Sequence, residues 1–175
     1  ALGHSLTPTE ALNLAIAAAE SSRGCTTPNP PVGAVILDSA GYVRGIGATQ
    51  PPGGPHAEIQ ALRMAGKHTV GGTAVVTLEP CNKWGRTGPC SHALAAAGIS
   101  HLYYAVADET SFKGGAQYLS KQGIHCVQFD SARQKQVKAE GLGAWLHKQK
   151  TGHPRVTVKM ASSLDGFSAA ADGTS

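Results

Sequence analysis

Aromatic side chains are scarce in this sequence, which holds 3 Phe, 2 Trp and 4 Tyr among 175 residues. A bulky aromatic core is therefore excluded. The 41% hydrophobic content, rich in alanine, favours close packing of helices on a sheet. Charged residues are also few, at 15%, which separates the chain from disordered and highly charged proteins. The length suits one domain of ordinary size and is too short for two.

Cysteine is rare as well, because the chain has only 4. That number is too small for a disulfide scaffold, so cysteines in motifs are expected to be ligands. Cys25 and Cys126 stand outside any motif and are expected to pack as thiols. The sequence also lacks a run of about 20 apolar residues and the pattern of a secretory signal. We predict a soluble, cytoplasmic protein with no membrane partner.

Hydrophobic spacing and turn residues predict helices that alternate with strands. Helices are expected at 8–22, 56–65, 90–97, 115–122 and 131–150, and strands at 32–37, 42–46, 73–78, 102–107 and 124–129. Thr7 and Glu10 have the spacing of a capping box for the first helix, and three prolines make 26–31 a rigid loop. The first two strands should form a hairpin. The order predicts an α/β fold of three αβα layers, with a mixed sheet and helices on both faces.

The C-terminal part of the sequence differs from the rest. Residues 1–150 hold all the elements of the predicted domain, and 151–154 has the composition of a linker. Val156 and Val158 then alternate with polar residues, which predicts a strand over 155–160. About twenty residues cannot bury a core of their own.

Three short motifs place metal-ligating residues where a strand or loop passes into a helix. They are His56-Ala57-Glu58, Pro80-Cys81 and Pro89-Cys90. One histidine and two thiolates are typical of zinc sites whose fourth position stays open for water. A closed structural site needs a fourth ligand. The remaining candidates, Cys25, Cys126, His68 and His92, form no ligand pair. Glu58 favours the open, catalytic site, because the H-x-E and P-C elements are those of zinc nucleobase deaminases, in which the glutamate carries protons.

The longer segments around these motifs carry a family resemblance. LEPCNKWGRTGPC (78–90), TPNPPVGAV (27–35) and GPHAE (54–58) resemble the deaminase domain of the bifunctional riboflavin-biosynthesis deaminase/reductase. The resemblance covers about residues 8–150, and the eight-residue loop between Cys81 and Cys90 is specific to that family among zinc deaminases. It implies a cytidine-deaminase-like fold and a hydrolase acting on cyclic amidines. The implied substrate is 2,5-diamino-6-ribosylamino-4(3H)-pyrimidinone 5′-phosphate, which loses its 2-amino group.

The segments 154–159 and 162–166 resemble the opening of that family's reductase domain, which is dihydrofolate-reductase-like. We therefore interpret 155–175 as the truncated start of a second domain. NADPH is expected to serve only that missing domain, and no reductase activity is expected from this chain.

The resemblance assigns roles to the motif residues. His56, Cys81 and Cys90 are expected to hold one Zn²⁺ per chain, which lowers the pKa of bound water from about 16 toward 7. The resulting hydroxide is the expected nucleophile. Glu58 is the expected catalytic proton shuttle, which takes the proton of that water and delivers it to the ring nitrogen and then to the departing amine.

The candidate substrate contacts match the family's residues only in part. They are Asn29, Thr49, Lys83, Arg86, Asp108 and Thr110. Lys83 and Arg86 lie between two ligands, where cations suit an anionic substrate, and Arg86 matches the family's phosphate contact. Thr49 and Lys83 replace family histidines, and Thr110 replaces a family asparagine. A solvated loop is the alternative for both cations, and a turn is the alternative for Asn29.

These departures leave other functions open. The same fold could deaminate another nucleobase, nucleotide or nucleic acid. A pI near 9.0 permits nucleic acid, but the basic residues are dispersed and nine aromatic residues offer few stacking platforms, so we expect no nucleic-acid partner. A non-catalytic module that keeps zinc for folding is a third hypothesis, and Glu58 argues against it. The resemblance implies association of copies through helices near the active site, so a homo-oligomer is open.

Overall fold

A five-stranded mixed sheet forms the centre of the molecule. The computed structural model describes residues 4–85, 88–163, 166–169 and 173. The strands are β1 (Gly33–Leu37), β2 (Val43–Ala48), β3 (Thr73–Leu78), β4 (His101–Val106) and β5 (His125–Gln128), in the order β2-β1-β3-β4-β5. β1 runs antiparallel to both β2 and β3, whereas β3, β4 and β5 are parallel. The predicted hairpin and mixed sheet are confirmed.

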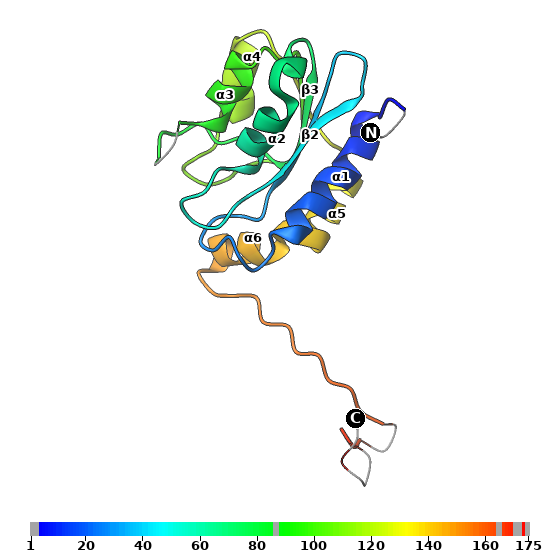
Figure 1. Cartoon of the computed structure of the whole chain (residues 1–175). Coiled ribbons are helices and arrows are strands. Elements are labelled where there is room, and N and C mark those ends of the chain that lie inside the picture. Colours follow the sequence, from blue (N-terminus) through cyan, green and yellow to red (C-terminus); the bar gives the residue numbers. More distant parts are fainter. Residues whose placement is uncertain (1–3, 86–87, 164–165, 170–172, 174–175) are drawn as a thin grey trace.

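Helices cover both faces of this sheet (Figure 1). They are α1 (Pro8–Ser21), α2 (Ala57–Ala65), α3 (Cys90–Ala96), α4 (Gly115–Lys121), α5 (Ser131–Val137) and α6 (Gly143–Thr151), with a short 3₁₀ helix, η1 (Gly66–Thr69). α1 and α5 lie on one face, and α2, α3 and α4 lie on the other. The three-layer αβα architecture is therefore as predicted. No helix in the described residues is both long enough and apolar enough to span a membrane.

Small residues let the layers approach closely. α1 begins with the predicted capping box, in which the amide of Thr7 donates to Glu10 and the amide of Glu10 donates to the Thr7 hydroxyl. α1 buries alanine and leucine against β1, and a Cβ at Gly33 would overlap the carbonyl oxygen of Ala15. The core is aliphatic, built around fully buried side chains such as Val35, Val75 and Leu102. The scarcity of aromatic residues is thus explained by tight helix–sheet packing.

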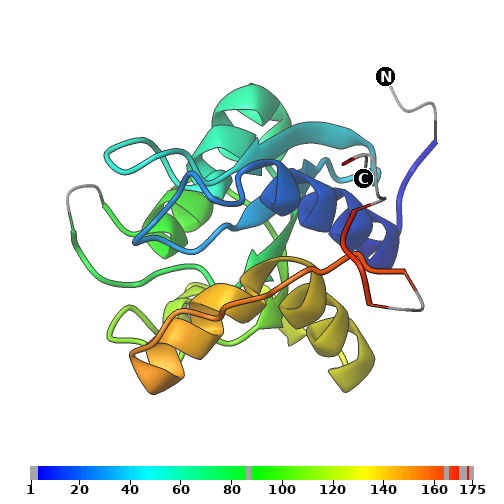
Figure 2. The ribbon, with the colours of Figure 1, turned by 90° about the horizontal axis from the view of Figure 1, so that it is seen from below.

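The helix predicted over 131–150 is interrupted. A π-helical turn, η2 (Lys138–Leu142), separates α5 from α6, and Figure 2 shows α6, in orange, at an angle to α5. The wider turn brings the carbonyl oxygen of Lys138 so close to Gly143 that a Cβ there would overlap it. Glycine at this position therefore permits the π turn, which helical periodicity alone does not reveal.

The strand predicted over 155–160 is absent. The chain after Gly152 runs away from the sheet without regular secondary structure (Figure 1). Val156, Val158 and Met160 are 78, 77 and 81% exposed. A strand requires a partner for its backbone groups, and none of the described residues supplies one here. α6 includes Thr151, the first residue of the predicted linker. The division at residue 150 stays a prediction.

Candidate metal centre and active site

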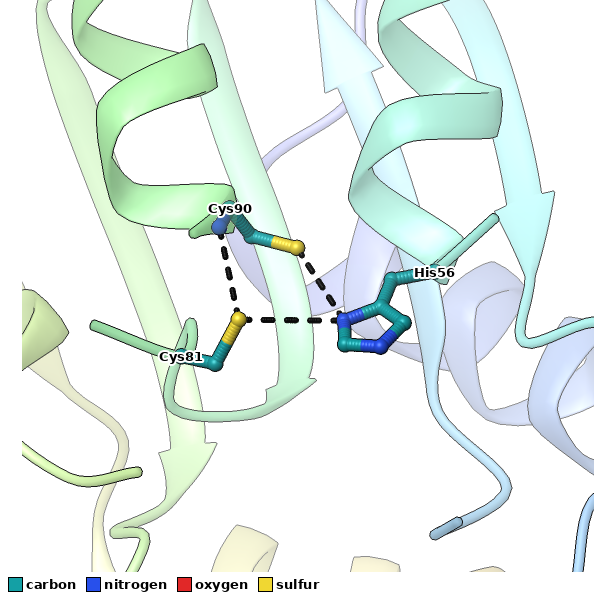
Figure 3. Close-up of side chains that lie close together, drawn as sticks. All are labelled: His56, Cys81 and Cys90. Carbon is teal, nitrogen blue, oxygen red and sulfur yellow. Dashed lines mark hydrogen bonds between the residues drawn. The ribbon is translucent and has the colours of Figure 1, made fainter. Parts of the chain in front are cut away.

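Three ligand side chains converge from two helix N-termini and one loop (Figure 3). His56 is the N-cap residue of α2, and its extended backbone turns the chain into that helix. Cys81 lies in the loop after β3, and Cys90 is the first residue of α3. Both helices begin at the same edge of the sheet, because α2 follows β2, α3 follows β3, and these two strands both run antiparallel to β1. The structure thus brings together the three residues that the sequence analysis named as metal ligands, and their role as zinc ligands stays a prediction.

The distances among the three side chains fit a tetrahedral zinc ion. Nδ1 of His56 lies 3.3 Å from Sγ of Cys90 and 3.7 Å from Sγ of Cys81. Zinc–sulfur bonds of about 2.3 Å and zinc–nitrogen bonds of about 2.0 Å place tetrahedral ligands about 3.6 Å apart. Within the described part of the chain, this is the one such group of three His, Cys, Asp or Glu residues.

The electrostatics of the two sulfurs also favour a cation. Hydrogen bonding from the Cys90 side chain, assisted by His56, lowers the pKa of Cys81 to about 4. The backbone amide of Cys90 donates to the same sulfur over 3.3 Å. The hydrogen bond to Cys81, together with burial, raises the pKa of the Cys90 thiol. Hydrogen bonding to Cys81 raises the pKa of His56. A cation between the sulfurs would stabilise both as thiolates.

Glu58 lies in the first turn of α2, two residues after His56. Its side chain is buried, with 4% of the residue exposed. Burial, followed by the charge of Cys81, raises the pKa of Glu58 to about 7. A carboxyl group with this pKa can accept and release a proton at neutral pH. The arrangement therefore places a buried carboxyl group with a raised pKa beside the three candidate metal ligands.

A cavity of about 710 Å³ opens beside this group, with His56, Glu58 and Cys81 in its wall. Four of the predicted substrate contacts also line it, namely Asn29, Thr49, Asp108 and Thr110. The Thr49 hydroxyl accepts the Val32 amide over 3.1 Å, so it also holds the start of β1. This volume lies in the ordinary range for small-molecule sites.

Of the two cations predicted as substrate contacts, the structure describes Lys83. Lys83 does not line the cavity; its ammonium group lies over the ring of Phe112, 5.3 Å from the ring centroid. Phe112 does line the cavity, so Lys83 lies at its rim. A cation over an aromatic face is electrostatically favoured, which explains this position. Arg86 lies outside the described residues.

Glu79 is a site residue that the sequence analysis missed. Its carboxylate accepts one hydrogen bond from the amide of Asp108 and another from the amide of Ala116, each 3.1 Å long. It thereby fixes the segment that carries Asp108 and Thr110 along the cavity. A Cβ at Gly115 would overlap the carbonyl oxygen of Pro80, so α4 begins directly against the Cys81 loop. The sequence did offer one indication of this role, because Glu79 is an acidic residue directly after the buried strand β3.

Helix α6 is the second missed contributor. Trp145, Leu146, Gln149 and Lys150 line the cavity, although the periodicity indicated only an amphipathic helix against the core. Nε1 of Trp145 donates a 3.1 Å hydrogen bond to the carbonyl oxygen of Pro28. The contact depends on the turn at Gly143, which no local sequence pattern revealed.

Comparison with known proteins gives one family match. Residues 7–106 match the family described as "Cytidine and deoxycytidylate deaminase zinc-binding region". The riboflavin biosynthesis protein RibD of Corynebacterium ammoniagenes is 50% identical over 95% of this chain and 49% of its own length. RibD of Escherichia coli K12 is 40% identical over 92% of this chain and 43% of its own. The chain thus spans about half the length of the curated relatives it matches.

Solved structures agree with this match. Acinetobacter baumannii RibD, form 2, superposes with a TM-score of 0.81 at 38% identity, covering 96% of this chain and 47% of that one. The structure of a diaminohydroxyphosphoribosylaminopyrimidine deaminase/5-amino-6-(5-phosphoribosylamino)uracil reductase from Thermotoga maritima gives 0.85 at 31% identity, covering 95% and 48%. A cyanophage dCMP deaminase, at 21% identity and a TM-score of 0.55, shares the fold. The predicted cytidine-deaminase-like fold is confirmed.

Proposed function

Because the chain belongs to the family of cytidine and deoxycytidylate deaminases with a zinc-binding region, we propose that it deaminates a pyrimidine of riboflavin biosynthesis. The proposed substrate is 2,5-diamino-6-ribosylamino-4(3H)-pyrimidinone 5′-phosphate. Its support is the similarity to RibD proteins and the activity in the name of the Thermotoga relative. The observation that carries the proposal is the group of His56, Cys81 and Cys90 with Glu58 buried beside it.

The proposed reaction replaces an amino group by a carbonyl oxygen. Zinc held by His56, Cys81 and Cys90 supplies Lewis acidity, which makes water a nucleophile at neutral pH. Glu58 accepts a proton from water and delivers it to the ring nitrogen next to C2. It then passes the second proton of water to the amino group. The oxygen of water forms a bond to C2, and the bond between C2 and the exocyclic amino nitrogen breaks. Ammonia leaves, and the oxygen of water remains as the C2 carbonyl oxygen.

The other cavity residues are proposed to bind and orient the pyrimidine. Asn29 lies on a rigid proline-bounded loop, and Asp108 accepts the Thr110 amide over 2.8 Å, which stabilises the opposing turn. Side chains held in this way recognise a ring with little loss of conformational entropy. Arg86, which matches the family's phosphate contact, and Lys83, which lies on the same loop between two proposed ligands, are retained as proposed contacts of the sugar phosphate.

The segment from 155 onward is proposed to belong to a second structural unit. Its alternating exposed apolar residues, Val156, Val158 and Met160, have the pattern of a strand that lacks a sheet partner. NADPH binding and reduction are proposed to reside in that unit and to be absent from residues 1–150.

The test is an ammonia-release assay with zinc-loaded protein. The phosphorylated diaminopyrimidine, cytidine and guanine are compared at equal concentration, with a tRNA as the nucleic-acid control. We expect turnover of the diaminopyrimidine alone, and one zinc ion per chain by metal analysis. Release from tRNA that falls steeply with salt would replace the proposal by a nucleic-acid deaminase. If none of these compounds releases ammonia, the proposed function is overturned.

A further inference from the structure

The charges along the cavity are unequal. Four carboxyl groups of the described residues line it, from Glu58, Glu79, Asp108 and Glu109. Against them, Lys150 is the one lysine or arginine among the described lining residues. A phosphate group that enters such a cavity needs a cationic partner, because carboxylates repel it. Among the described residues of the cavity lining, Lys150 is therefore the one lysine or arginine available to pair with a phosphate group.

The position of Lys150 follows from the helix that carries it. Trp145, Leu146, Gln149 and Lys150 line the cavity, and they are spaced so that the second pair lies one helical turn beyond the first. The hydrogen bond from Trp145 to Pro28 holds this face of α6 against the loop that carries Asn29. Lys148, in the same last turn, does not line the cavity. Two lysines of one turn thus differ in the side that they face.

The end of α6 alone does not attract an anion. Its last carbonyl groups carry partial negative charge, so phosphate recognition there requires a full positive charge on a side chain. Lys150, at the end of α6 and in the cavity lining, can supply that charge. Lys83, one of the two cations expected from the sequence, lies over Phe112 at the rim, and the other, Arg86, lies outside the described residues.

We propose that Lys150 is a specificity-determining residue that pairs with the 5′-phosphate of the substrate. The inference rests on the proposed function, because it assigns a partner to the phosphate of that substrate. It adds α6 to the substrate-binding surface, with Gln149 beside Lys150 as a hydrogen-bonding neighbour.

The experiment compares Lys150→Ala with the matched control Lys148→Ala, which removes the same charge from the same turn. Each variant and the wild type are assayed with the phosphorylated diaminopyrimidine and with its dephosphorylated counterpart. Loss of a charged hydrogen-bonding pair corresponds to about a 10- to 100-fold fall in kcat/KM. We expect that fall for Lys150→Ala on the phosphorylated compound, carried by KM, with unchanged kcat/KM on the dephosphorylated one. Lys148→Ala should match the wild type, and Lys150→Arg should retain most of the preference.

Other outcomes overturn the inference. Equal preference for phosphate in Lys150→Ala and Lys148→Ala would overturn it and leave the proposed function intact. An equal loss on both substrates would assign Lys150 a structural role and likewise exclude phosphate pairing. A wild type that deaminates neither compound would overturn the proposed function and the inference together.

Discussion

The indole nitrogen of Trp145 donates a hydrogen bond to the backbone carbonyl of Pro28 across 117 positions of sequence. Both residues line the cavity beside the metal-ligand group. This single bond therefore joins the C-terminal helix of the domain to the loop before β1. Helix α6 therefore forms one wall of the cavity.

Trp145→Phe keeps an aromatic ring and removes this hydrogen bond. A neutral hydrogen bond contributes about 0.5–1.5 kcal/mol, so we expect KM for the diaminopyrimidine to rise about 3- to 10-fold. The value of kcat should change little, because the metal ligands and Glu58 are untouched. Steady-state kinetics with both parameters measured separately provide the check.

Trp84→Phe is the matched control. Trp84 is 72% exposed and does not line the cavity, so the same substitution there should leave KM unchanged. Equal effects of the two substitutions would contradict the role given to Trp145.

Glu58→Gln tests the proton shuttle. Glutamine is nearly the same size but cannot carry a proton, so kcat should fall about 10²- to 10⁴-fold. Zinc content and Tm should be retained, because the buried site loses only a charge. Glu140→Gln, at an exposed position outside the cavity, serves as the control. Activity within a few-fold of the wild type would exclude Glu58 as the proton carrier.

The fold was largely readable from the sequence because strong local signals agree with the tertiary structure. The capping box at Thr7, the β-branched run of β3 and the glycine after α3 all mark real boundaries. The prediction of a strand over 155–160 was wrong because alternating apolar residues indicate a face that can be buried, but they do not supply the neighbouring strand that must pair with it. The π turn before Gly143 was not predicted, because it depends on a close approach between the backbone at Lys138 and at Gly143, which helical periodicity does not indicate.

The site was readable only where residue type itself specifies the chemistry. His56, Cys81 and Cys90 were found because imidazole and thiolates at such motifs have few other uses. Glu79 was missed because its two hydrogen bonds reach amides 29 and 37 positions away. Lys83 was expected near the mouth of the active site, and it lies over the ring of Phe112, a contact that the sequence did not indicate. Long-range contacts of this kind leave no pattern in the local sequence.

Zinc removal should lower thermal stability and abolish activity together. Ligand bound at about 1,000 times its Kd stabilises the folded state by about 4 kcal/mol, so chelation should lower Tm by about 10 °C and abolish activity. Cys90→Ser should reproduce both effects, whereas Cys25→Ser, at an exposed position, should bind one zinc ion like the wild type. Thermal unfolding and metal analysis measure these outcomes. A stable, active protein after complete chelation would contradict the assignment of the metal site.

Glu79→Gln tests whether one carboxylate holds the substrate-binding segment in place. The amides of Asp108 and Ala116 each donate to a separate oxygen of Glu79, and glutamine offers only one oxygen. One amide then faces the NH₂ group, at a cost of about 1–3 kcal/mol, so Tm should fall by several degrees. KM should rise at the same time, because Asp108 and Thr110 line the cavity. Glu109→Gln, which removes a neighbouring exposed carboxylate, should leave Tm unchanged. If the two substitutions lower Tm equally, loss of negative charge near the cavity would account for the effect, and the two hydrogen bonds would not.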